Sequence, residues 1–253
     1  MKKYNLFFSP TGGTKKVTYP LMVGFGEDFT NINMITYQDF DKLQFEEDDL
    51  CLISVPSYGG RVPGPAVEIL CDLKGNGAKA VLVVVYGNRA IDDTLVELSD
   101  VLENSNFTCI AGIQAVAQHS LIPSFGAGRP DNDDAHELQA FAEEILETMK
   151  TENYSKALSF PGSRPYVEFP GVPLKPKTTG KCTQCGLCAQ ECPAHAIPKK
   201  NPKLTNNEKC ISCMHCVYVC PEHARKISPI MVKVAETKMK KACSGRKPNK
   251  LYI

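Results

Sequence analysis

The chain of 253 residues lacks several features that would place it in common classes of protein. No apolar stretch approaches the ~18 residues that a membrane-spanning helix needs, so we expect no membrane span. The nucleotide-binding patterns GxxxxGK[ST] and GxGxxG are both missing. The serine, cysteine or paired-carboxylate machinery of a hydrolase is not recognisable either. Cysteine, by contrast, is abundant, with twelve in the chain.

Eight of these cysteines follow a repeated spacing. The pattern CxxCxxCxxxCP occurs at residues 182–193 and again at 210–221. It is typical of proteins that bind two [4Fe–4S] clusters, in which the fourth cysteine of each run ligates the other run's cluster. Crossed ligation assigns to cluster I Cys182, Cys185, Cys188 and Cys220, and to cluster II Cys210, Cys213, Cys216 and Cys192.

A zinc ribbon and a disulfide framework are the two alternative interpretations of these cysteines. A zinc ribbon uses two CxxC pairs per ion, whereas each run here supplies three closely spaced sulfurs and a fourth. A disulfide framework is disfavoured because the opening MKKYNLFFSP does not resemble a signal peptide. We therefore expect iron–sulfur ligation in a reducing, cytoplasmic compartment. Residues 178–230 resemble the two-cluster bacterial ferredoxins.

The net charge of +1 hides a marked asymmetry between the two parts of the chain. Residues 1–150 carry 11 Lys and Arg against 22 Asp and Glu, whereas residues 151–253 carry 18 against 6. Two oxidised clusters of about −2 each offset only part of the second excess. We interpret the basic half as docking on the acidic half or steering an acidic partner, rather than binding nucleic acid.

The first strand leads into a candidate phosphate loop. Residues 3–9 (KYNLFFS) form an apolar run suited to a buried parallel strand. A hydroxyl- and glycine-rich turn and the start of a helix follow, and this combination binds anions. An ordinary strand-to-helix turn is the alternative. The SxTGxT pattern resembles the FMN phosphate loop of flavodoxins, with candidate residues Ser9, Thr11, Gly12, Gly13 and Thr14.

Four further strands are predicted at 31–36, 48–55, 79–86 and 107–116. Ligands of an open parallel sheet bind outside the carboxyl ends of its strands, so the loops there should form one site. Candidate flavin contacts in these loops are Pro56, Ser57, Tyr58, Gly59, Gly60, Tyr86, Gly87, Asn88 and His119. Tyr58 would stack on the flavin ring or be an exposed turn aromatic. His119 would lie near the flavin or be structural.

The helices and the remaining segments complete the expected architecture. We predict helices at 90–104 and 131–150, the second with Asp131 as its N-cap. The residues Cys51, Cys71, Cys109 and Cys243 have no ligand spacing and are expected to be buried. Residues 159–178 are rich in proline and glycine and predict an extended connector. The lysine-rich end of the chain is either a solvated face or docked on the acidic part.

Five strands alternating with helices, and three loops at one sheet edge, resemble a flavodoxin. The resemblance implies an α/β fold, a doubly wound five-stranded parallel sheet of order 2-1-3-4-5 that binds FMN. A small α+β two-cluster ferredoxin domain would follow. The expected boundaries are a flavodoxin-like domain at 1–155, a connector at 156–178, the ferredoxin domain at 179–230 and a basic tail at 231–253.

Together these features resemble flavodoxin–ferredoxin fusion proteins. FMN exchanges one or two electrons and each cluster exchanges one, so the resemblance implies an electron relay to redox partner proteins. An FMN-dependent reductase of a small molecule is the main alternative, and a redox sensor is a third. Whether the protein forms a homodimer stays open.

Overall fold

The computed structural model describes residues 1–150 and 158–253. Its main sheet has the strand order β2-β1-β3-β4-β5-β8, and the first five strands in this order are parallel. The predicted order 2-1-3-4-5 is therefore confirmed. These five strands are β1 (Lys3–Phe7), β2 (Phe29–Asn33), β3 (Leu50–Pro56), β4 (Lys79–Tyr86) and β5 (Thr108–Val116).

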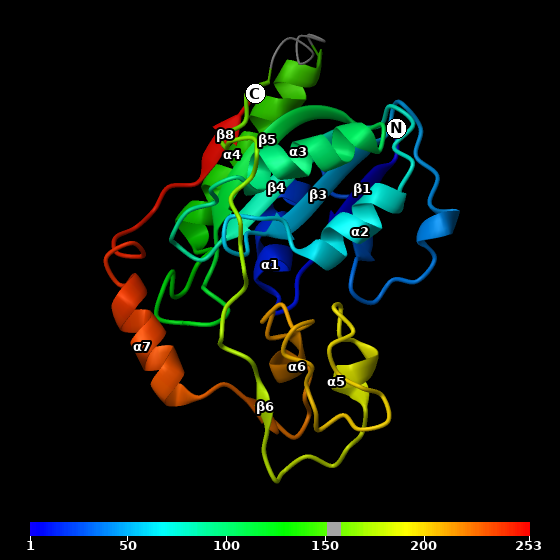
Figure 1. Cartoon of the computed structure of the whole chain (residues 1–253). Helices are drawn as coiled ribbons and strands as arrows, with labels where there is room; N and C mark the ends of the chain where they lie inside the picture. Colours follow the sequence, from blue (N-terminus) through cyan, green and yellow to red (C-terminus); the bar gives the residue numbers. More distant parts are fainter. Residues whose placement is uncertain (151–157) are drawn as a thin grey trace.

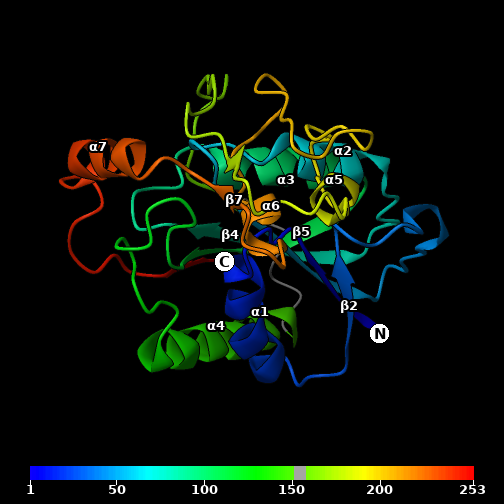
Figure 2. The ribbon, with the colours of Figure 1, turned by 90° about the horizontal axis from the view of Figure 1, so that it is seen from below.

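Helices cover both faces of this sheet (Figures 1 and 2). Helices α1 (Gly13–Gly24) and α4 (Asn132–Lys150) pack together on one face, and α2 (Gly64–Asp72) and α3 (Thr94–Asn104) on the other. Along β4, alternate side chains enter the two cores, and all of those from Ala80 to Val85 are buried. A central parallel strand is buried on both faces, which explains its uninterrupted apolar sequence.

The helix before β5 begins later than predicted. The expected helix started at residue 90, whereas α3 begins at Thr94. Asp92 has a φ angle of 42°, which is not a helical value, so the helix cannot extend back through this residue. The start of α4 agrees with prediction, since the Asp131 Oδ1 accepts the Asp134 N–H at 3.1 Å. Asp134 Oδ2 in turn accepts the Asp131 N–H at 2.9 Å, a reciprocal cap.

The cysteine-rich part lies against the carboxyl end of the sheet (Figure 1). It contains the antiparallel pair β6 (Lys177–Thr178) and β7 (Arg225–Lys226) and two single-turn helices, α5 (Leu187–Gln190) and α6 (His215–Tyr218). Helix α7 (Pro229–Met239) follows. In the described ranges no helix is both long and apolar enough to cross a bilayer.

The connector lies along α3 instead of hanging free. Two backbone N–H groups, of Ser163 and Val167, donate to the two oxygens of Asp93 at 2.8 and 2.6 Å. Arg164 forms an ion pair with Asp100. Each buried carboxylate oxygen of Asp93 therefore satisfies one connector amide, and the connector approaches the sheet edge along a fixed path.

The end of the chain returns to the sheet, which the sequence did not predict. Strand β8 (Lys250–Tyr252) pairs antiparallel with β5 as a sixth strand. Asn249 is buried, donates to Asp134 and Glu137 at 2.9 and 2.6 Å, and accepts the Val116 N–H at 2.9 Å. Three residues are too few to show an alternating pattern, so the strand could not be read from the sequence. Of the two alternatives for the tail, docking is correct for its last residues.

The expectation for the four spare cysteines was wrong at one position. Cys51 and Cys243 are buried and Cys109 is half-buried, but Cys71 near the end of α2 is exposed. Burial raises the pKa of Cys109 to about 12, so its thiol stays protonated at neutral pH. Cys71 lies on the solvent-facing side of α2, outside the hydrophobic core.

We expect Asn249→Ala to destabilise the flavodoxin-like part by about 1–3 kcal/mol, because it leaves the buried Val116 N–H without its acceptor. Chemical unfolding followed by far-UV circular dichroism measures this change. Ile253→Ala is the matched control, since this terminal side chain is exposed and should shift stability by less than about 0.5 kcal/mol. Equal effects of the two variants would show that the Asn249 bonds do not hold the tail.

Candidate functional site

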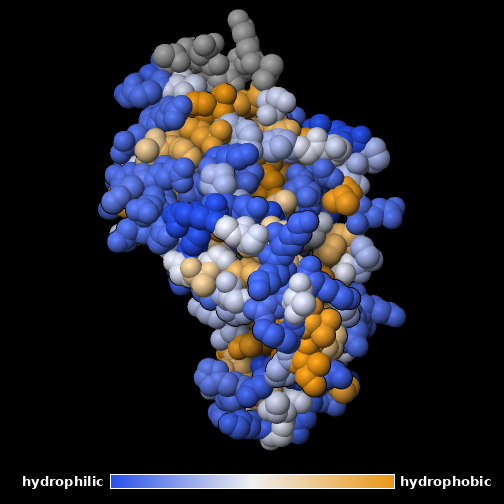
Figure 3. All heavy atoms as spheres, turned by 90° about the vertical axis from the view of Figure 1, so that its left-hand side faces the viewer, coloured by the Kyte–Doolittle hydropathy of each residue, from blue (hydrophilic) through white to orange (hydrophobic). Residues whose placement is uncertain are grey.

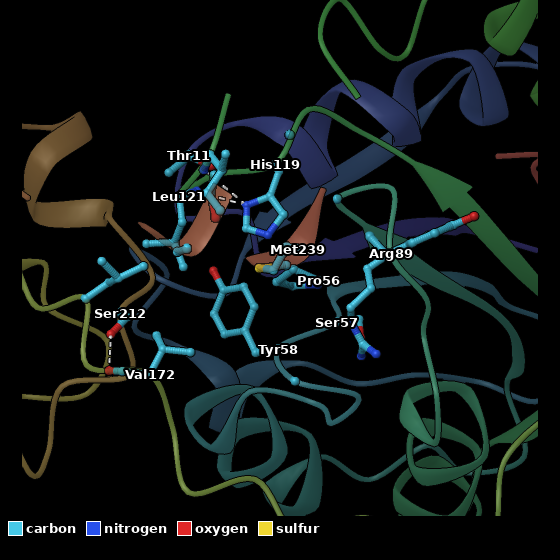
Figure 4. A pocket seen from close by; sticks show the side chains of 18 of the residues that line it. Thr11, Pro56, Ser57, Tyr58, Arg89, His119, Leu121, Val172, Ser212 and Met239 are labelled. Carbon is cyan, nitrogen blue, oxygen red and sulfur yellow. Dashed lines mark hydrogen bonds between the residues drawn. The ribbon is translucent and has the colours of Figure 1, made fainter. Parts of the chain in front are cut away.

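The loops at the carboxyl edge of the sheet surround one cavity of about 790 Å³ (Figure 4). It contains most of the residues that the sequence singled out for a flavin. Those that line it are Ser9, Thr11, Gly13, Thr14, Pro56, Ser57, Tyr58, Gly59, Tyr86, Gly87 and His119. The remaining three predicted residues, Gly12, Gly60 and Asn88, are in the same loops but outside the lining.

The loop between β1 and α1 has the conformation of an anion site. Gly12 has a φ angle of 83°, a left-handed conformation that favours glycine. The Ser9 hydroxyl oxygen accepts the Lys15 N–H at 2.9 Å, which holds the loop closed around the start of the helix. The first N–H groups of a helix attract anions, so the loop fits a phosphate group.

The loop after β3 is a tight reversal that presents Tyr58. The Tyr58 N–H donates to the Arg61 carbonyl at 3.0 Å, and the intervening Gly59 and Gly60 have φ angles of 63° and 86°. A Cβ on Gly59 would lie 2.0 Å from Phe169, so the connector ring packs directly on this glycine. Figure 4 shows the Tyr58 ring in the middle of the cavity. Burial raises the pKa of its phenol, which therefore stays protonated.

The loops after β4 and β5 contact each other. A Cβ on Gly87 would lie 2.6 Å from His119, so only glycine fits beside this ring. The buried Asn88 amide donates to the Cys243 and Gly245 carbonyls at 2.7 and 2.8 Å. The Asn88 side chain thus binds the C-terminal segment. A contact between the Asn88 backbone and a flavin stays a prediction.

His119 is held in one tautomer. Its Nδ1 accepts the N–H groups of Leu121 and Ile122 at 3.1 and 3.3 Å, so the ring proton is on Nε2. Burial, and next the nearby Arg89 charge, lower the pKa of His119 from 6.5 to about 4. The ring therefore lines the cavity as a neutral group at physiological pH.

We expect His119 to stay neutral from pH 8 down to about pH 5, because its pKa in the folded state lies well below that of an exposed histidine. Nuclear magnetic resonance of histidine-labelled protein measures this titration. His119→Asn assigns the signal among the five histidines, since its amide oxygen replaces the Nδ1 acceptor without a titrating ring. A midpoint near 6.5 for this signal would contradict the burial argument.

The other walls of the cavity come from segments that the sequence analysis did not assign to it. The connector contributes Val172, Pro173 and Leu174, and the cysteine-rich part contributes Ile211 and Ser212. The Ser212 hydroxyl donates to the Val172 carbonyl at 3.5 Å, so these two walls are joined (Figure 4). Helix α7 closes another side with Ile230, Met231, Val234, Ala235, Lys238 and Met239.

One sequence signal could have revealed part of this enclosure. In the lysine-rich helix α7, Ile230, Val234 and their neighbours form an apolar stripe at helical spacing. An apolar stripe on one face of a helix predicts that this face packs on another part of the protein. The apolar residues of the connector carry no comparable pattern, because an extended strap has no fixed period.

The eight clustered cysteines form two groups of four around two separate small cavities. One cavity is lined by Cys182, Cys185, Cys188 and Cys220. The other is lined by Cys192, Cys210, Cys213 and Cys216. This is the grouping that crossed ligation predicts, and four thiolates per cavity match the ligand number of a [4Fe–4S] cluster. Among the described residues, no three His, Cys, Asp or Glu side chains are placed to hold a single metal ion.

The two cavities share a local symmetry. The Ala196 N–H donates to the Cys192 sulfur at 3.3 Å, and the Ala224 N–H donates to the Cys220 sulfur at the same distance. Both bonds join the fourth cysteine of a run to the residue four positions later. Hydrogen bonds to ligand sulfur tune the potential of a cluster, so both sites have this contribution in common.

His215 connects the second cysteine cavity to the phosphate loop. The residue is buried within the Cys210–Cys220 run, and its Nδ1 lies 2.7 Å from the Pro10 carbonyl oxygen. Because a carbonyl can only accept, the Nδ1–H is the donor. Its Nε2 lies 3.0 Å from Glu191, the neighbour of Cys192. One side chain thus contacts both candidate cofactor sites.

A family model matches the cysteine-rich part. Residues 181–225 match the model described as a 4Fe-4S dicluster domain. The chain joins a flavodoxin-like fold to a 4Fe–4S dicluster domain. The strand order identifies the fold of the first part, and the family match identifies the second.

Solved structures of flavoproteins are similar to the N-terminal part. A flavodoxin from Streptococcus pneumoniae TIGR4 is 19% identical, with a TM-score of 0.42 over 58% of this chain and 99% of that chain. A Fusobacterium nucleatum flavodoxin bound to flavin mononucleotide is 12% identical, with a TM-score of 0.41 over 60% and 99%. The NADH:FMN oxidoreductase EMOB in apo form is 16% identical, with a TM-score of 0.43 over 65% and 97%. No curated protein matches the chain.

Two double variants test the crossed grouping. Cys192→Ala/Cys210→Ala removes two ligands of one cavity, so one cluster of about four irons should remain. Cys182→Ala/Cys192→Ala removes one ligand from each cavity and should impair both. Iron analysis and electron paramagnetic resonance of the reduced proteins measure the outcome. If each run ligated its own cluster, the two results would be exchanged.

Proposed function

We propose that the protein is an electron-transfer protein that binds FMN and two [4Fe–4S] clusters and relays electrons between them. When bound, FMN exchanges one or two electrons and each cluster exchanges one. The two groups of four cysteines hold the clusters, and the cavity of about 790 Å³ holds the flavin. Redox proteins are the donor and the acceptor, and the compartment is the cytoplasm.

A single observation carries this proposal. The cavity for FMN and the cavity for cluster II share a wall, since Ile211 lines both and lies between the ligands Cys210 and Cys213. No further layer of protein separates the two sites at this residue. Electron transfer falls steeply with distance, so the shared wall makes cluster II the partner of the flavin and cluster I the outer site.

The residues of the flavin cavity have separate roles in this proposal. The loop at residues 9–14 binds the phosphate through backbone N–H groups and hydroxyls. Tyr58 offers its ring for stacking, and its neutral phenol adds no charge to the site. His119 is also neutral, so neither group places a full charge beside the flavin. His215 holds the phosphate loop at its place beside cluster II.

An FMN-dependent reductase is a second candidate, favoured by helix α7. Its side chains Ile230, Met231 and Val234 line the cavity and yet are 78%, 40% and 50% exposed. An apolar area lies among hydrophilic atoms on the side of the molecule that carries α7 (Figure 3). A small apolar substrate could reach the flavin along this wall, with the clusters supplying electrons.

The relay is tested by rapid mixing of the anaerobic holoprotein with a reductant, while flavin absorbance and cluster signals are followed. We expect flavin and clusters to equilibrate at a rate independent of protein concentration. The cluster II variant Cys192→Ala/Cys210→Ala should slow the exchange between flavin and cluster I by at least about tenfold, because the intermediate site is lost.

The matched control removes the other cluster. Cys182→Ala/Cys185→Ala should leave the exchange between flavin and cluster II at its original rate. Exchange that depends on protein concentration would reject an intramolecular relay. Turnover of a small apolar acceptor, lowered by Val234→Asp, would instead favour the reductase.

A further inference from the structure

The two cysteine runs end in similar short sequences that differ at two positions. The first run continues as CPAHAI at 192–197 and the second as CPEHAR at 220–225. At one of these positions, Ala194 of the first run is replaced by Glu222, which is exposed to solvent and lines the same cavity as Arg225.

The second difference is buried. Ile197 lines the cavity of cluster II, and Arg225 lines the cavity of cluster I. They are 4% and 2% exposed. The symmetry that relates the two sites therefore places a cation where its counterpart is an apolar side chain.

The contacts of Arg225 leave its charge without an anionic partner. Its guanidinium donates to the Thr205 hydroxyl at 2.8 Å, to the Leu204 carbonyl at 3.1 Å and to the Pro202 carbonyl. All these acceptors are neutral, and no carboxylate pairs with it within the described part of the chain. Its Nε–H is buried and has no hydrogen-bond partner there.

Such an arrangement is costly unless a negative group lies nearby. A buried charge is normally paired, because the transfer of an ion out of water into the protein interior is unfavourable. An oxidised cluster with four thiolate ligands carries a net charge of about −2, and the cavity that Arg225 lines is built for one. The cluster itself would supply the missing counter-charge.

We propose that Arg225 is the counter-charge of cluster I and holds this cluster at a higher reduction potential than cluster II. Reduction adds one electron and makes the cluster more negative, so a buried cation favours the reduced form. Cluster II has the uncharged Ile197 at the matching position, so we expect Arg225 to stabilise its reduced form less. The inference rests on the proposed function, since it assumes that both cavities hold clusters.

The positions of the two cavities show in which direction this difference in reduction potential would move electrons. Cluster II adjoins the flavin cavity, whereas Cys185 of cluster I is exposed. One electron on cluster II would move to cluster I, which holds it near the surface for transfer to an oxidised partner protein. The Arg225 guanidinium also lies close to cluster II, since the Thr205 hydroxyl that it contacts lines the cavity of that cluster. Both clusters must therefore be measured.

The test is a redox titration of the full-length holoprotein followed by electron paramagnetic resonance. Arg225→Ile copies the residue of the first run and should lower the potential of cluster I more than that of cluster II. A shift of about 59 mV corresponds to a tenfold change in the equilibrium constant for one-electron exchange between the clusters. Signals are assigned with Cys192→Ala/Cys210→Ala, which retains only cluster I.

Two further variants separate charge from packing. Arg225→Lys keeps the charge without the fork of hydrogen bonds and should keep most of the original potential. Lys226→Ile removes an exposed charge from the next residue and should have little effect, because solvent screens it. If Arg225→Ile does not assemble its clusters, the potentials of Arg225→Lys and Lys226→Ile are compared with each other instead.

The proposal is overturned if Arg225→Ile leaves the potential of cluster I unchanged with eight irons bound, or if Arg225→Lys lowers it equally. These are equilibrium measurements. They are independent of the exchange rates that test the relay, so failure of the relay and failure of this inference are distinguishable.

Discussion

The hydrogen bond from His215 to the Pro10 carbonyl joins the two halves of this molecule at the point where their sites meet. His215 belongs to a cysteine run, and Pro10 belongs to the loop between β1 and α1. Because the ring is buried and bonded on both nitrogens, its rotation would leave polar groups unsatisfied. Ile211 and Ser212, which line the cavity, belong to the same cysteine run as His215.

Buried polar side chains also hold the segments that close the cavity. Asp93 accepts two amides of the connector, and Asn88 binds two carbonyls of the C-terminal segment. Both residues stand at or near the carboxyl end of β4, in the loop that leads to α3. The loop between β4 and α3 lies at the carboxyl edge of the sheet, where the cavity is. The same loop therefore also binds the connector and the C-terminal segment.

The two parts of the chain carry opposite net charges, but only some of these charges form ion pairs between the two parts. Arg164 pairs with Asp100, and Arg246 pairs with Asp131, across the two parts. Exposed pairs of this kind contribute about 0–1 kcal/mol each, so they orient more than they stabilise. Most lysines of the cysteine-rich part, such as Lys181 and Lys203, remain exposed and leave a basic surface near the cavity lined by Cys182. A basic surface of this kind attracts acidic molecules.

The sequence by itself predicted the strands, a candidate phosphate loop and the grouping of the cysteines into two runs, because each depends on residues close together in the chain. The strand order followed only from the resemblance to flavodoxins. A continuous apolar run predicted β4 with its bounds unchanged, and the spacing of Cys182–Cys192 is set by local loop geometry. Only the tertiary structure decided what encloses the cavity. Ile211, Val172 and Val234 come from three distant segments, and β8 is too short to carry a pattern. The role that we propose for Arg225 likewise depends on its lack of a carboxylate partner among residues 1–150 and 158–253, which no spacing in the sequence indicates.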